Sequence, residues 1–141
     1  MNLSRIVLAA FGAFVAYFVL GGLLFALLPS MKHEYMKYPA VYRSQEGMKK
    51  TMPFAMIATF VAIFVLAVIY GLLCQGGPGL AEGARYGSLI GVFAICTFVI
   101  HNYVILNIGI KITFQQSVAY FLQWLVVGIV IGLIYHPLPT H

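Results

Sequence analysis

The chain has 141 residues, of which 62% are hydrophobic and 8% are charged, and its formal net charge is +5. Soluble domains carry roughly 25% charged residues, so this composition excludes a water-soluble enzyme or binding domain. We expect one membrane domain over residues 1–141, with any activity confined to the bilayer or its surface.

Four uninterrupted apolar runs dominate the chain, over residues 6–28, 52–73, 84–106 and 114–135. Each run reaches the roughly 20 residues that cross the hydrocarbon core of a bilayer as a helix. The first run follows Arg5, as a secretory signal would, but it exceeds the roughly 7–15 residues of a signal core, so we expect a retained helix. The predicted fold class is an all-α integral membrane protein, a bundle of four transmembrane helices.

The segment 29–51, between the first two runs, is basic and aromatic. Pro29 cannot continue the preceding helix and starts this loop. Four large side chains recur in it at helical spacing: Met31, Tyr35, Tyr38 and Tyr42. The spacing predicts an interfacial amphipathic stretch on the membrane surface, which Pro39 divides into two short pieces. An aromatic belt that anchors the loop is favoured over a surface for docking a partner.

Lysines and arginines near the ends of the runs predict the orientation of the chain. Six lie on one side of the membrane and two on the other: Lys32, Lys37, Arg43, Lys49, Lys50 and Lys111, against Arg5 and Arg85. Because positively charged loops stay in the cytoplasm, this bias predicts that both termini lie outside. The basic loop is expected to face anionic lipid headgroups and no nucleic acid.

The sequence also predicts how the second and third helices begin. Pro53 is expected in the first turn of the second helix, where its missing N–H costs little. A Gly-Gly-Pro-Gly turn then leads into the third helix, where Glu82 complements the helix dipole and Arg85 reaches the headgroups. Because they lie three residues apart, Glu82 and Arg85 are predicted to form a charge pair at the membrane boundary. A pair lining an entrance is the alternative.

Glycines mark the surfaces through which helices are expected to pack. Gly83, Gly87 and Gly91 recur at intervals of four on the third helix, and Gly128 and Gly132 repeat that interval on the fourth. Such stripes let a neighbouring backbone approach closely. We expect contacts within the bundle, with contact to another subunit as the alternative.

A polar group inside the third run, His101 with Asn102, is the most informative candidate site, because ionisable side chains within a span are rare and usually functional. His101 follows Gly83 by 18 residues, and 100° per residue returns it to the same face, so it is predicted to point into the bundle. Other polar side chains fall at comparable depth: Thr59, Gln116, Tyr120 and Gln123. Together these residues form the predicted intramembrane polar cluster.

Three uses of this cluster stay open. Its members can hold the helices together by hydrogen bonds, line a pocket for a lipid headgroup, quinone or other ligand, or supply His101 as an axial ligand to a haem or chlorophyll metal. A bis-histidine haem needs two intramembrane histidines, and only one is present. His136 and His141 are expected to belong to a terminal tail rather than a metal site. Glu82 is the only acidic residue outside segment 29–51, so no catalytic constellation is expected.

The second half of the chain resembles small bacterial membrane proteins of four helices that are grouped as a domain of unknown function. The resemblance lies in residues 81–91 (AEGARYGSLIG), in Asn102-Tyr103 and in residues 128–132 (GIVIG). It implies the four-helix architecture and carries no activity or ligand. We accordingly expect the bacterial inner membrane.

The leading functional hypothesis is a non-catalytic accessory or assembly subunit of a larger membrane complex, packing through its glycine faces. Its expected partners are membrane lipids and other integral membrane subunits or a second copy, and no cofactor is expected beyond surface lipids. The alternatives are a small transporter or ligand-binding protein using the cluster around His101, and a haem- or chlorophyll-carrying subunit using His101 as ligand.

Overall fold

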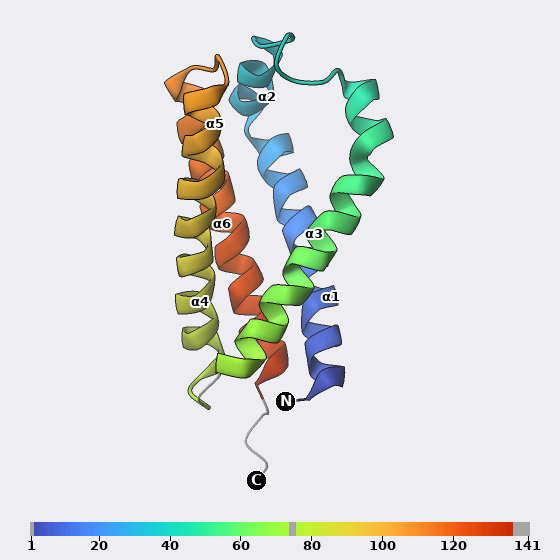
Figure 1. Ribbon diagram of the computed structural model, residues 1–141, viewed down its shortest axis with the longest axis vertical. Helices are drawn as coiled ribbons and strands as arrows, with labels where there is room; N and C mark the ends of the chain where they lie inside the picture. The colour runs from blue at the N-terminus through green and yellow to red at the C-terminus, as the bar shows by residue number, and fades with distance from the viewer. Residues whose placement is uncertain (1, 74–75, 137–141) are drawn as a thin grey trace.

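The computed structural model describes residues 2–73 and 76–136, and these form four helices long and apolar enough to cross a membrane (Figure 1). In chain order the elements are α1 (Leu3–Leu27), α2 (Pro29–Met36), α3 (Gln45–Leu73), α4 (Gly79–Ala94), the π-helix η1 (Ile95–Val99), α5 (Ile100–Ile105) and α6 (Ile110–Tyr135). Elements α4, η1 and α5 together make the third span. The predicted all-α bundle of an integral membrane protein is confirmed.

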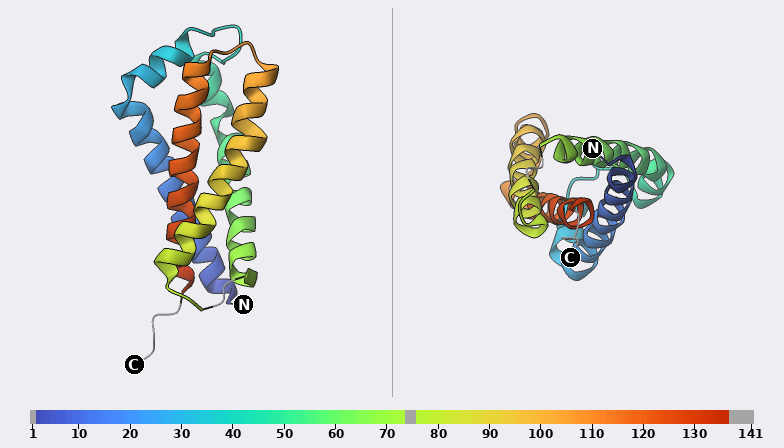
Figure 2. Two further views of the ribbon diagram at one scale, coloured as in Figure 1. Left: turned by 90° about the vertical axis from the view of Figure 1, so that its left-hand side faces the viewer. Right: turned by 90° about the horizontal axis from the view of Figure 1, so that it is seen from below.

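Helix α6 is the centre of the bundle. Seen along the long axis, α6 lies between α4 and α1, and α3 runs across the remaining side (Figure 2). The main core joins α1, α3 and α6 in the half of the bundle nearest the N-terminus: Ile6, Ala9, Ala10, Ala13, Ile63, Ala67, Tyr70, Val127 and Ile131. Small alanines in α1 let the helices approach closely, as packing in a membrane requires.

The third span contains a π-helical turn, and the turn changes which face of the span points inward. Gly83, Gly87 and Gly91 are buried in α4, and the next buried residue is Val99 at the end of η1. In an uninterrupted α-helix the buried face that contains Gly91 would return two turns later, at position 98. A π-turn inserts one residue, so it returns at Val99 instead. Everything after η1 is therefore rotated by about 100° relative to α4.

Helix α3 packs on the bundle only through its second half. Its buried residues are Ile63, Ala67 and Tyr70, whereas the first half leans away from α1 (Figure 1). The helix begins at Gln45, seven residues before the expected start, so Pro53 lies inside it and the prediction of a first-turn proline is wrong. The carbonyl that loses its donor belongs to Lys49, in the polar segment that precedes the apolar run, where water can satisfy it.

Residues 29–44, the part of the basic segment that precedes α3, fold over one end of the bundle. Pro29 occupies the first position of α2, a site that suits proline because its N–H would have no partner. The expected second helical piece is a turn instead, in which Tyr38 O accepts from Val41 N and Tyr42 N at 3.0 Å. Residues 29–44 are called the cap below.

Candidate functional site

The tyrosines of the cap close the end of the bundle above Gln116. The buried Gln116 Nε2 donates to Tyr35 Oη at 2.9 Å and to Tyr42 Oη at 3.2 Å. The two tyrosine rings meet edge to face, with centroids 4.7 Å apart. Burial raises the pKa of both hydroxyls. The hydroxyls of Tyr35 and Tyr42 thus turn inward to α6, and the position of these aromatics at the membrane surface stays a prediction.

A buried carboxylate ties the cap to α6. Glu34 is 3% exposed, and its Oε1 accepts from Lys37 Nζ at 2.6 Å and lies 3.0 Å from Lys111 Nζ. The two ammonium groups hold the pKa of the Glu34 carboxyl below its usual value. A buried charge is tolerated only when it is paired, so this ion pair fixes α2 against the start of α6. Sequence reasoning missed it because only the fold brings Lys111 to Glu34.

A third contact completes this attachment. Gly109 N, just before α6, donates to Tyr38 Oη at 2.9 Å. The cap is thus held by an ion pair, a glutamine and a backbone amide, all at the first turns of α6. It is a fixed part of the structure rather than a loose connection.

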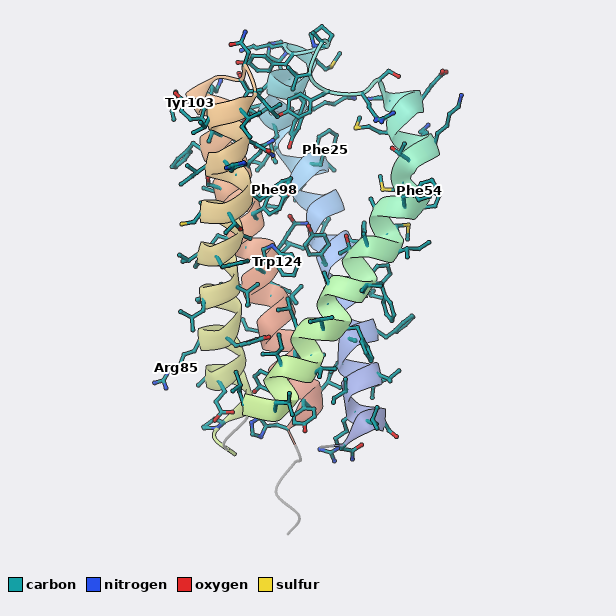
Figure 3. The ribbon with its side chains drawn as sticks, in the orientation of Figure 1. Phe25, Phe54, Arg85, Phe98, Tyr103 and Trp124 are labelled. Carbon is teal, nitrogen blue, oxygen red and sulfur yellow. The ribbon has the colours of Figure 1, made fainter. Side chains whose placement is uncertain are left out.

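His101 points away from the bundle, so the prediction that it faces inward is wrong. Its side chain is exposed, Asn102 is half-buried, and Tyr103 is 42% exposed near the end of α5 (Figure 3). The cause is η1, whose additional residue turns His101 about 100° from the glycine face. At this level the third span contributes Phe98, whose ring lies 5.5 Å from that of Tyr120.

The remaining members of the predicted polar cluster are separated. Gln123 Nε2 donates to the backbone carbonyl of Tyr17 at 3.2 Å, and Gly21 leaves room for it, since a Cβ there would meet Gln123 Nε2 at 2.5 Å. Thr59 is half-buried on α3. Gln116 and Gln123 thus have partners on the cap and on α1, an arrangement that favours helix association over a ligand pocket.

The five glycines lie at the contact between α4 and α6. A Cβ at Gly83 would stand 2.5 Å from the carbonyl oxygen of Gly128, and one at Gly87 would stand 2.6 Å from that of Trp124. A Cβ at Gly91 would meet the Phe121 ring at 3.0 Å. These glycine faces are occupied within the chain, so another subunit has to bind elsewhere.

Glu82 faces inward at the opposite end of the bundle. Its Oε2 lies 2.9 Å from His136 Nε2, and its Oε1 accepts from Gly77 N at 2.8 Å. Arg85 is exposed and points away from the bundle (Figure 3). Glu82 therefore connects the loop before α4 to the end of α6. It also lies in the first turn of α4, near the N-terminus of that helix. Residues 137–141, with the tail histidine His141, lie outside the described residues.

One further surface was not predicted. Three methionines of α3 recur at intervals of four, and they are called the methionine face: Met48, Met52 and Met56, with exposures of 41%, 44% and 40%. At 100° per residue, this face continues into the buried Ile63 and Tyr70. The methionines thus occupy the packing side of α3, beyond the point where that side meets the bundle.

The wall opposite the methionine face is the second half of α1. The two helices touch at Phe14 and Phe60, whose ring centroids are 5.5 Å apart. Beyond that contact, Phe25 is 39% exposed. The two helix halves that diverge beyond it thus present aromatic and methionine side chains.

Within residues 2–73 and 76–136, no group of three or more His, Cys, Asp or Glu side chains could hold a metal ion. Comparison of the chain with protein-family models, curated proteins and solved structures finds no match. The class defined by the structure is therefore a small four-helix integral membrane protein.

Proposed function

We propose that this protein is a non-catalytic accessory subunit of a membrane complex, and that it binds a transmembrane helix of another protein between α1 and α3. The observation that carries the proposal is the methionine face. It extends the internal interface of α3, yet Met48, Met52 and Met56 are 40–44% exposed. In its second half, α3 buries Ile63 and Tyr70 against the bundle. The same side of the helix is exposed in its first half, where a partner helix could pack against it.

The chemistry of the face suits a helical partner. Methionine is unbranched and polarisable, and methionine-rich surfaces adapt to partners of differing shape. Helices associate in a bilayer through van der Waals packing, which small residues assist. Phe25 on the opposite wall is 39% exposed and supplies apolar contact area for such a helix.

The rest of the molecule provides a rigid support for this opening. Close glycine contacts fix α4 to α6, and the ion-paired Glu34 fixes the cap. The basic cap favours a cytoplasmic position, which would put both termini outside a bacterial inner membrane. The transporter and haem alternatives relied on His101 facing the bundle interior, and its exposed position removes that support.

Site-specific photo-crosslinking in the native membrane tests the proposal. A photo-reactive amino acid replaces Met52 in one strain and Ile57 in a matched control, because Ile57 lies on the outer side of α3 and is 65% exposed. We expect Met52 to yield a discrete crosslinked protein that mass spectrometry identifies, and Ile57 to yield none. Crosslinks to lipid alone at both positions would refute the proposal, and a visible spectrum of the purified fraction tests for a pigment.

A further inference from the structure

A groove lies on the other flank of α1, against α2 and the first half of α6. Its volume is about 180 Å³. The lining residues are Leu24, Leu28, Ser30, Phe114, Gln115, Val118 and Ala119. All of these except Ser30 and Gln115 are apolar, so the groove offers hydrocarbon walls with one polar end.

The groove runs along the spanning direction. Leu24 lies one helical turn, about 6 Å, deeper than Leu28, and Ala119 lies the same distance deeper than Gln115. Ser30 and Gln115 mark the end beside the cap, where the chain leaves the apolar spans. This polarity matches that of a phospholipid, with its acyl chain in the bilayer core and its headgroup at the interface.

The polar end contains an acceptor with no partner. Gln115 Nε2 donates to Ser30 Oγ at 3.3 Å, but the buried Gln115 Oε1 has no hydrogen-bond partner among the residues that the structure describes. Buried carbonyl oxygens are normally satisfied. The Gln115 side chain lines the groove, so a lipid headgroup hydroxyl would satisfy this oxygen once the amide turns towards the groove.

The surrounding charge is positive. Lys32 and His33 follow Ser30 on the exposed side of α2, and the cap side as a whole carries more basic than acidic residues. The nearest acid, Glu34, is already paired with Lys37 and Lys111. Anionic headgroups are attracted to basic segments at a membrane surface.

We infer that this groove binds one acyl chain of an anionic phospholipid whose headgroup carries a hydroxyl, as in phosphatidylglycerol, with that headgroup at Ser30 and Gln115. The headgroup hydroxyl donates to Gln115 Oε1, and the phosphate lies at the basic cap, on the side of α2 that carries Ser30 and His33. The site is separate from the methionine face and does not depend on the proposed function. It would attach a lipid where the cap meets α1 and α6.

Native mass spectrometry of the purified protein tests the inference. The probes are phosphatidylglycerol and phosphatidylcholine with identical acyl chains, added to the wild type and to two variants. Val118→Trp fills the groove from its rim, because Val118 is 44% exposed. Leu122→Trp is the matched control, one turn further along α6, 37% exposed and outside the groove lining.

We expect the wild type and Leu122→Trp to retain one phosphatidylglycerol about fivefold more tightly than phosphatidylcholine, the factor of one hydrogen bond to the Gln115 carbonyl oxygen. Val118→Trp should lose that bound lipid. Gln115→Leu, which keeps the apolar walls, should lower the preference between the two lipids towards one. Equal lipid retention by Val118→Trp and Leu122→Trp would overturn the site. An unchanged preference in Gln115→Leu would overturn the assignment of the headgroup.

Discussion

Adding a single methyl group at Gly87 is expected to force α4 and α6 apart. A Cβ there would lie 2.6 Å from the carbonyl oxygen of Trp124 and 2.7 Å from that of Leu125. Both obstacles are backbone atoms, which cannot rotate away as a side chain can. The helices must separate, and overpacking of this kind costs roughly 1–3 kcal/mol.

Gly22→Ala is the matched control for Gly87→Ala. Both changes replace a helical glycine by alanine, so the gain in helix propensity of about 0.5–1 kcal/mol is common to them. A Cβ at Gly22 meets nothing within 4 Å. The difference in unfolding free energy between the two variants therefore isolates the overpacking cost, roughly 1–3 kcal/mol.

Unfolding in mixed detergent, followed by far-UV circular dichroism, measures this difference. Fluorescence of Trp124, the only tryptophan, adds a local probe because it lies inside the bundle (Figure 3). The close α4–α6 contact would be refuted if Gly87→Ala and Gly22→Ala unfolded within about 0.5 kcal/mol of each other, the usual range for unobstructed surface changes.

Three further outcomes are expected. The pKa of Glu34 is lowered in the folded protein, so the ion pair stabilises the protein above pH 4.5, the usual pKa, and this stabilisation is lost as the pH falls below that value. The difference in unfolding free energy between the wild type and Glu34→Gln should therefore shrink in acid. A constant difference would contradict the ion pair. Gln116→Leu removes two hydrogen bonds, to Tyr35 and Tyr42, and should lower the unfolding free energy by about 1–2 kcal/mol; an unchanged value would show that the cap is held without Gln116. His101→Ala should change stability by no more than about 0.5 kcal/mol, because the side chain is exposed, and a much larger loss in the same detergent assay would count against its outward orientation.

The spans and the glycine contact were readable from the sequence because each follows from a local pattern. Apolar run length is set by bilayer thickness, so the four spans were predicted, although each helix begins three to seven residues before its apolar run. Glycines at intervals of four have one physical use in such helices, close approach. Met48, Met52 and Met56 have the same spacing in the sequence. Only the burial of Ile63 and Tyr70 shows that this side of α3 is the one that faces the bundle.

Other features depend on contacts between distant parts of the chain. The π-turn at Ile95–Val99 has no signature in composition, and missing it placed His101 on the wrong face. The early start of α3 lies in polar residues that apolar run length ignores. The ion pair of Glu34 with Lys111 could not be predicted either, because the two residues lie far apart in the sequence and meet only when α2 packs on α6.

The outward lean of α3 makes the molecule wedge-shaped, broader at the cap end than at the end holding the N-terminus (Figure 1). The two leaflets of a bilayer therefore meet different cross-sections of the same protein. If a partner helix binds between α1 and α3, as proposed, it fills the broader half of the wedge and makes the two cross-sections more nearly equal.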